Sequence, residues 1–402
     1  MNRKKLLTKI IRTGSKVFDI VPINNKRILF TSYSGKQFSC NPKYIYEYMK
    51  LHYPNYEYVW AFNDPDKYQF LVSDNTKVIK YNSLKFVYES MTAMCIITNV
   101  ELSPCVMYRG NKQLRLNTWH GGGCYKLAGY DTLKVGANED RLRHSYGLIN
   151  TWVSSSKFFS QHVIVGGFRF HGKILETGMP RNDILTNEIS KKKRDEILKR
   201  LGLKDYDRKI ILYAPSFREL SEFNSVDNLI FDYKKILELL KDRDKKDYYF
   251  LCRAHHYMKS TYNSLDLSLI DVSNYPDMQE LLSVADILIT DYSSVIWDYS
   301  IRNKEIYLYT PDLDQFVATR SFYKEIHEWG FPVAVNEEKL QEYVSMRAGV
   351  GCGKRHIDML EGYECGKATE MVTSYIVETM DNLDRKGKYD GKIKNCLRQT
   401  QH

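Results

Sequence analysis

Cysteine is scarce in this sequence, and so are long apolar runs. Eight cysteines stand among 402 residues, and no two have the Cys-x-x-Cys spacing. This argues against a zinc knuckle and favours a reduced, cytosolic compartment. No apolar run is long enough to cross a bilayer, and the first residues lack the continuous apolar core and small-residue cleavage site of a signal peptide. The sequence therefore predicts neither a membrane-spanning helix nor a secretory signal.

The composition is that of a globular protein with an excess of positive charge. Hydrophobic residues make up 43% of the chain and charged residues 27%. A chain of 402 residues exceeds what one hydrophobic core usually supports, so two domains are expected. Basic residues outnumber acidic ones by 59 to 49, which gives a net charge of +10. This excess suits an anionic partner, such as nucleic acid, anionic lipid or a phosphorylated substrate.

The first 24 residues have an amphipathic pattern. Apolar side chains from Leu6 to Val21 recur at helical spacing, and basic side chains from Arg3 to Lys16 lie mostly on the other side. Basic amphipathic helices of this kind lie in the surface of anionic membranes. We expect such a helix over residues 1–24, with a surface helix packed on its own domain as the alternative.

Strands and helices then alternate along the chain. The pattern predicts an α/β fold of two doubly wound, Rossmann-type domains that face a cleft, with residues 25–186 in the first and 187–402 in the second. A Pro-Arg-Asn-Asp turn followed by a charged helix marks the boundary, near 182–191. The expected strands include 27–33, 56–62, 77–81, 95–99, 114–120, 151–156, 173–178, 209–215, 248–252, 267–272, 287–289 and 306–309, and the expected helices include 44–51, 83–94, 191–201, 233–240 and 278–284.

The segment after the buried strand Ile287–Ile289 is the first candidate site. Asp291, Ser293 and Ser294 follow this strand and precede a segment with helical spacing. A turn from strand to helix directs backbone N–H groups and the positive end of the helix toward one point, and the two serines add hydroxyl donors. The pattern predicts a phosphate site, with an ordinary helix cap as the alternative.

A second candidate lies where the expected strand 114–120 runs into glycines. His120 can exchange a proton near neutral pH, and Gly121 and the glycines after it allow the backbone to approach a ligand closely. A structural histidine in a glycine-rich turn is the alternative. The His-Gly-Gly-Gly run is similar to the oxyanion loop of esterases, but the chain has no Gly-x-Ser-x-Gly nucleophile elbow.

Further basic groups follow other expected strands. His255 comes shortly after the strand 248–252, so it pairs with His120 across the predicted cleft, although His256 is an alternative. Ser216 and Arg218 follow the strand 209–215, and Arg181 lies at the domain junction. Either arginine is able to clamp a phosphate with two hydrogen bonds, with a surface or salt-bridge arginine as the alternative. A glycine-rich run at 349–355 does not fit the Walker pattern.

Taken in order, these motifs resemble the CDP-glycerol glycerophosphotransferase family of teichoic acid synthesis. The resemblance covers about residues 25–380 and rests on the following segments: Trp119-His120-Gly121, 213–218 (Tyr-Ala-Pro-Ser-Phe-Arg), 253–255 (Arg-Ala-His), 290–294 (Thr-Asp-Tyr-Ser-Ser) and the opening loop 30–44. The chain departs from the family pattern after His120, where Gly-Thr-Pro-Leu is more usual, and at His256, where proline is usual. In length the chain resembles the shorter, primase-type members.

The resemblance implies a GT-B-like fold and a transferase at the cytoplasmic face of the plasma membrane. This enzyme would move a polyol phosphate, with sn-glycerol 3-phosphate as the leading candidate, from CDP-glycerol to a hydroxyl of a lipid-linked saccharide or a growing polymer, and it would release CMP. The product would belong to teichoic acid or capsule synthesis. His120 would be the base and His255 would neutralise the donor phosphates. The remaining donor-binding residues would be Gly121, Arg181, Ser216, Arg218, Asp291, Ser293 and Ser294.

No cluster of metal ligands is apparent, so no metal and no cofactor besides the CDP-glycerol co-substrate are expected. Nucleic acid is not an expected partner, and the sequence does not indicate an oligomeric state. Three alternatives stay open: a CDP-ribitol donor, a GT-B glycosyltransferase that uses a nucleotide sugar, and a non-catalytic binder of membranes or nucleic acid.

Overall fold

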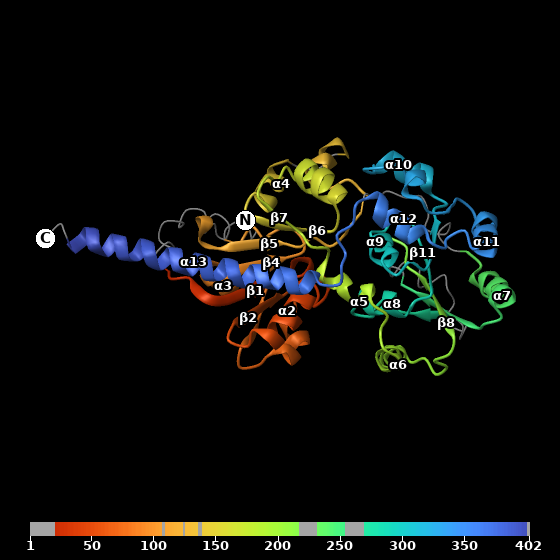
Figure 1. The fold of residues 1–402 in the computed structure, drawn as a ribbon, viewed down its shortest axis with the longest axis horizontal. Helices are drawn as coiled ribbons and strands as arrows, with labels where there is room; N and C mark the ends of the chain where they lie inside the picture. The colour runs from red at the N-terminus through yellow and green to blue at the C-terminus, as the bar shows by residue number, and fades with distance from the viewer. Residues whose placement is uncertain are drawn as a thin grey trace, which may run out of the picture.

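Two parallel β-sheets, lying next to each other along the long axis, organise the molecule (Figure 1). The structure is a computed structural model. It describes residues 21–106, 109–123, 125–135, 139–216, 231–253 and 269–399. The predicted α/β class is confirmed.

The first sheet has seven strands in the order β3-β2-β1-β4-β5-β6-β7, and every neighbouring pair is parallel. Its central strands are almost wholly apolar because helices cover both faces, as in other parallel sheets. The strands are β1 Asn24–Phe30, β2 Glu57–Phe62, β3 Thr76–Lys80, β4 Ala93–Thr98, β5 Leu114–Asn117, β6 Thr151–Ser154 and β7 Lys173–Glu176.

The second sheet repeats this topology with six parallel strands in the order β10-β9-β8-β11-β12-β13. In both sheets the first strand in sequence lies inside the sheet, and the strand order reverses beside it: between β1 and β4, and between β8 and β11. Ligands of such sheets bind outside the carboxyl ends of the strands at this reversal. The strands are β8 Lys209–Tyr213, β9 Tyr248–Cys252, β10 Leu269–Asp271, β11 Ile287–Thr290, β12 Glu305–Tyr309 and β13 Val333–Ala334.

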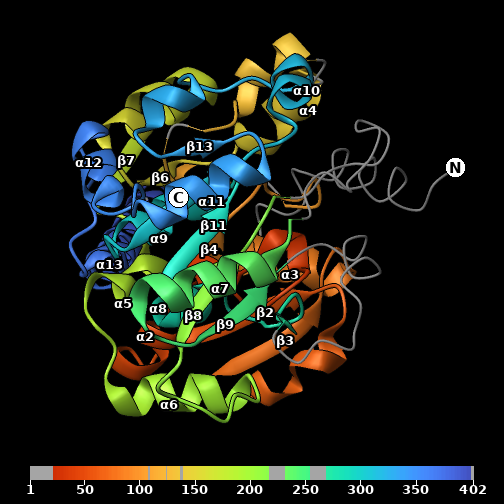
Figure 2. The same ribbon diagram turned by 90° about the vertical axis from the view of Figure 1, so that its right-hand side faces the viewer.

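Helices pack around both sheets (Figure 2). With the first sheet lie α2 Cys40–His52, α3 Leu84–Thr92, α4 Glu139–Tyr146 and the π-helix Phe159–Gly167. With the second lie α6 Lys191–Arg200, α7 Tyr233–Asp244, α8 Met278–Val284, α9 Val295–Ser300, α10 Leu313–Thr319, α11 Glu337–Ser345 and α12 Cys352–Met359. The short helix α5 Asp183–Thr186 follows the link between the sheets, and α13 Ala368–Gln399 ends the described chain.

Several element boundaries differ from the predicted ones. Helix α2 starts at Cys40 rather than at 44, because Ser39 is extended and Pro42 is accommodated in the first turn. Strand β5 ends at Asn117, three residues before His120. Residues 93 and 94, predicted to end a helix, belong to β4.

Helix α13 returns to the first sheet. Val372, Ile376 and Met380 are buried in the core of the first sheet, next to α2, β1 and β4. The predicted domain bounds place this helix with the second unit, and they do not anticipate its return. Figure 1 shows α13 lying along the first sheet and extending past it.

The two sheets are also linked through the loop that follows the glycines. Lys126 pairs with Phe322 in an isolated antiparallel bridge, and Leu127 donates its N–H to the carbonyl of Ser321 (3.0 Å). Tyr125 enters the core of the second sheet, where its hydroxyl lies 2.8 Å from Nε2 of His356. This loop, which connects strands of the first sheet, is therefore held by the second.

The amphipathic segment predicted over residues 1–24 lies almost entirely outside the described residues, so it stays a prediction. Within the described part of the chain, no helix has both the length and the apolar character needed to cross a membrane.

Candidate active site

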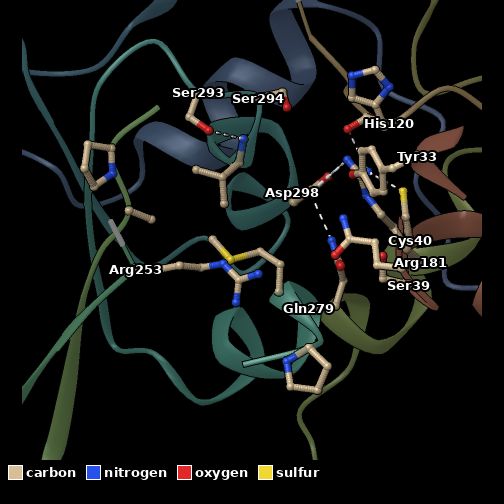
Figure 3. A pocket seen from close by; sticks show the side chains of 16 residues that line it. Tyr33, Ser39, Cys40, His120, Arg181, Arg253, Gln279, Ser293, Ser294 and Asp298 are labelled. Carbon is tan, nitrogen blue, oxygen red and sulfur yellow. Dashed lines mark hydrogen bonds and ion pairs between the residues drawn. The ribbon is translucent and has the colours of Figure 1, made fainter. Parts of the chain in front are cut away.

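Two adjoining cavities of about 250 and 310 Å³ lie between the sheets, and His120, Ser293 and Ser294 line both of them. The cavities open at the carboxyl ends of strands from both sheets. Figure 3 shows the first cavity, with Ser293, Ser294 and Arg253 of the second sheet facing His120 and its neighbours from the first. Arg181 lines the first cavity and Gly121 the second, so five of the predicted site residues meet at this place.

Ser293 and Ser294 lie between β11 and α9, as predicted. Both are partly exposed, and Ser293 Oγ accepts a long hydrogen bond (3.4 Å) from the N–H of Val295. The backbone N–H groups of the two serines have no acceptor among the described residues. This turn thus presents two hydroxyls and two N–H groups without adding a charge, which is the donor chemistry that a phosphate needs.

His120 is held in one tautomer. Its Nδ1 lies 2.8 Å from the carbonyl oxygen of Asn99, which follows β4 at the strand-order reversal. A carbonyl oxygen only accepts, so Nδ1 carries the proton and Nε2 keeps a free lone pair. Burial, assisted by the nearby charge of Arg181, lowers the pKa of His120 to about 4. The ring is therefore neutral near pH 7 and able to accept a proton.

The backbone around His120 is strained. Trp119 and Tyr33 have φ angles of +52° and +46°, which non-glycine residues seldom adopt. Their rings flank the imidazole, with centroids 4.4 and 5.5 Å from it. Strain of this kind is retained where surrounding contacts impose it, and it gathers at functional sites.

Arg181 lines the cavity, but its charge is already paired. Its guanidinium contacts the Asp298 carboxylate at 2.9 Å, and both side chains are almost wholly buried. It also donates to the carbonyl of His120 (2.8 Å). Although burial opposes the charge, Asp298 raises the pKa of Arg181 above its ordinary value. This geometry suits a positioning residue, which holds the His120 turn, better than the predicted phosphate clamp.

Arg253, at the end of β9, is the cavity cation without a carboxylate partner among the described residues. The only described hydrogen bond of its guanidinium goes to the carbonyl of Tyr275 (2.7 Å). Burial lowers the pKa of Arg253 below its usual value, because no nearby anion fully compensates the desolvated charge. A bound phosphate would supply that anion.

Gly121 and Gly122 let the His120 loop approach α9 closely. A methyl group at Gly121 would lie 3.0 Å from Ser294 Cβ, and one at Gly122 would overlap the indole ring of Trp297. Gly121 therefore acts by allowing close approach of the two walls.

Asp291 and Ser216 bond to each other. The Asp291 carboxylate accepts from the N–H (2.9 Å) and the hydroxyl (3.0 Å) of Ser216, and neither residue lines the two cavities. They connect the ends of β8 and β11. The described geometry therefore favours a bracing role over the predicted donor contact for both.

Arg218, His255 and His256 lie outside the described residues, so their predicted roles stay predictions. The glycine-rich run 349–355 is a packing feature: methyl groups at Gly349 and Gly353 would press on the backbone of Ile306 and Ser300. Among the residues with described positions, no three His, Cys, Asp or Glu side chains gather closely enough to hold a metal ion.

Three contributors to the site were not predicted from the sequence. Asn99 acts through its carbonyl, and Asp298 lies on a helix whose register the sequence did not reveal. Arg253 could have been found, because it belongs to the same Arg-Ala-His motif that pointed to His255.

The fold and the site define an α/β protein with a cavity lined by hydrogen-bond donors at the strand-order reversals of two parallel sheets. Residues 15–353 match the family model described as CDP-Glycerol:Poly(glycerophosphate) glycerophosphotransferase, and the chain belongs to that family.

Curated relatives are consistent with this family assignment. The chain is 35% identical over 321 residues to the teichoic acid poly(glycerol phosphate) polymerase of Staphylococcus epidermidis, with 76% of this chain and 43% of that protein covered. It is 31% identical over 355 residues to the polymerase of the same name from Bacillus spizizenii, with 86% and 89% covered. The chain thus spans less than half of the first relative and most of the second.

Solved structures show the same fold. The wall teichoic acid polymerase TagF, in a variant form, matches with a TM-score of 0.79 and 28% identity over 94% of this chain and 95% of that one. UDP-GlcNAc 2-epimerase from Neisseria meningitidis, bound to UDP-GlcNAc, matches with a TM-score of 0.51 at 12% identity, covering 88% of this chain and 100% of that one. The second likeness concerns the fold alone.

Proposed function

We propose that this chain transfers sn-glycerol 3-phosphate from CDP-glycerol to an acceptor hydroxyl and releases CMP, in teichoic acid or related polymer synthesis. The observation that carries the proposal is the position of neutral His120 at the junction of the two cavities, opposite Ser293, Ser294 and Arg253. Membership of the glycerophosphotransferase family supports this reading.

The proposed arrangement is GT-B-like, with the acceptor on the first-sheet side and the CDP donor on the second. The repeated strand order supports this arrangement, because each sheet brings its own reversal point to the cavity. Ser293 and Ser294 would hold the pyrophosphate with hydroxyl and N–H donors, and Arg253 would supply positive charge. His255 and Arg218 follow β9 and β8, respectively, so they would act from the same side.

In the reaction, the acceptor hydroxyl attacks the phosphorus that bears glycerol, and the bond from this phosphorus to the oxygen of CMP breaks. The hydroxyl proton moves to Nε2 of His120, whose Nδ1–H stays bonded to Asn99. A negative donor beside the ring would raise the pKa of His120 from about 4, which makes the ring a better base. Positioning and electrostatic stabilisation would provide most of the rate.

The acceptor would be a lipid-linked saccharide or a growing polymer at the cytoplasmic face of the membrane, where the basic segment 1–24 would attach the protein. Relatives named for ribitol phosphate, such as the Bacillus spizizenii teichoic acid poly(ribitol-phosphate) polymerase at 24% identity, make CDP-ribitol the second donor to test.

The test is CMP release by the purified chain with CDP-glycerol, CDP-ribitol or UDP-sugars and a lipid-linked disaccharide acceptor. We expect acceptor-dependent CMP from one CDP-polyol and a loss of about 100-fold or more in His120→Ala, because a general base contributes at least that much. His327→Ala is the matched control, since this histidine is exposed and lies outside both cavities. Turnover only with a UDP-sugar would make the chain a glycosyltransferase. Full activity of His120→Ala would show that His120 is not the general base.

A further inference from the structure

The N-terminus of helix α2 opens onto the first cavity, on the wall opposite Ser293 and Arg253. Ser39, the residue that precedes this 13-residue helix, and Cys40, its first residue, both line the cavity. Figure 3 shows Ser39 and Cys40 beside Arg181, on the same side as His120 and away from Arg253. A ligand held here would lie along the wall that carries the base.

The donors at this helix end are unused. Ser39 is 6% exposed and makes no capping bond to α2, and its hydroxyl has no hydrogen-bond partner in the part of the chain that the structure describes. The backbone N–H groups of Cys40 and Asn41 have no acceptor among the described residues, and Pro42 has no N–H. Cys40 has a φ of +61°, so Ser39 does not adopt ordinary capping geometry, and its buried hydroxyl stays available to a ligand in the cavity.

The surroundings suit an anion. Arg181 contacts Cys40 Sγ through Nη1 (3.0 Å), and its buried Nε has no partner. The one carboxylate among the cavity-lining residues is Asp298, which already accepts from Arg181, Asn182 and Gln279. A negative group at the α2 N-terminus would therefore meet donors and the positive end of a helix, with no unpaired carboxylate nearby.

We propose that the N-terminus of α2, with Ser39 and Cys40, binds a phosphate of the acceptor. This inference rests on the proposed function, because the acceptor hydroxyl must lie at His120. The donor phosphates occupy the opposite wall, so this subsite takes the phosphodiester next to the attacking hydroxyl. This subsite would select an acceptor whose last unit is already joined by a phosphodiester, as in the poly(glycerophosphate) of the family description, so the enzyme would extend a started chain.

The experiment compares two acceptors that differ by one methyl group, which removes the negative charge. One is glycerol joined to a dodecyl chain through a phosphodiester, and the other is its neutral methyl phosphotriester. We expect kcat/KM for CMP release to be at least about 10-fold higher with the phosphodiester, and Ser39→Ala to remove most of that preference through the acceptor KM. The KM for the CDP donor should not change. Ser39→Asp, which puts a carboxylate in the subsite, should lower kcat/KM for the phosphodiester further and spare the neutral acceptor.

Ser190→Ala is the matched control. Ser190 also precedes a helix, α6, but its hydroxyl accepts from the N–H of Lys193, and it lies outside the cavities. Loss of Ser190 should cost stability without changing acceptor preference, whereas Ser39→Ala should leave the melting temperature nearly unchanged.

Each outcome decides between the two proposals. Equal rates with both acceptors, or a Ser39→Ala effect on both alike, would overturn the subsite and leave the transferase function standing. Absence of CMP from every CDP-polyol would contradict the function. Calorimetric binding of glycerophosphoglycerol then tests the subsite without turnover: weaker binding to Ser39→Ala supports it, and equal binding to both proteins refutes it.

Discussion

Glu364 should make the stability of this protein fall as the pH rises. Its carboxyl group accepts from the indole Nε1 of Trp297 (2.8 Å), the N–H of Met179 (3.1 Å) and Nδ2 of Asn182 (3.2 Å), so it joins α9 to the link between the sheets. Burial nevertheless dominates and raises the pKa of Glu364 from 4.5 to about 8. The folded protein therefore keeps a proton that the unfolded chain releases.

The size of the effect follows from that difference. Each pH unit between the unfolded and folded pKa values contributes about 1.4 kcal/mol, so the free energy of unfolding should fall by about 5 kcal/mol between pH 4.5 and 8 from Glu364 alone. The sign is fixed because the folded state binds more protons in this window. The stabilising contribution is complete below pH 4.5 and is lost as the pH passes 8.

Glu364→Gln isolates this contribution. The amide cannot ionise, but its NH₂ group would face the N–H of Met179, so the variant should be less stable than wild type by about 1 kcal/mol at pH 5. At pH 9 the variant should be the more stable of the two, by about 3 kcal/mol. Urea unfolding of both proteins from pH 5 to pH 9 measures the pH at which their free energies of unfolding become equal. If the difference in free energy of unfolding between wild type and variant did not change with pH, the reasoning would be refuted.

Two further predictions concern the cavity walls. Arg253→Gln should raise the KM for the CDP donor by about 10-fold or more in steady-state kinetics, because a cation without a carboxylate partner is lost. Arg194→Gln is the control and should cause no such rise, because this arginine bonds to carbonyls outside the cavities. Gly122→Ala should lower the free energy of unfolding by about 1–3 kcal/mol, because the methyl group overlaps Trp297. Gly166→Ala should not, because its methyl group would make only an ordinary contact of 3.4 Å with the carbonyl oxygen of Gln161; unfolding of both variants in urea gives the comparison.

The alternation of apolar strands and helices predicted most of the fold, because buried parallel strands are nearly continuous apolar runs. It also placed His120, Ser293 and Ser294 at strand ends, where topology brings them together. Helix α13 could not be placed in the same way, since its amphipathic pattern does not say which sheet it covers.

The site itself was predicted less completely than the fold. Arg181 was predicted to clamp a phosphate, but its pairing with Asp298 depends on two segments more than 100 residues apart. Asp291 and Ser216 were chosen for their polar side chains, and the sequence did not show that these side chains satisfy each other. Ser39 drew no attention, because a serine before a helix is ordinary until its hydroxyl is found unused.

The return of α13 has a consequence for synthesis on the ribosome. Val372, Ile376 and Met380 complete the core around β1 and β4, whose residues leave the ribosome hundreds of residues earlier. The first sheet therefore waits with an uncovered apolar face until the last helix emerges, and it is exposed to aggregation during that interval. Chains that terminate early, before residue 368, would keep this face open and should be removed by chaperones and proteases.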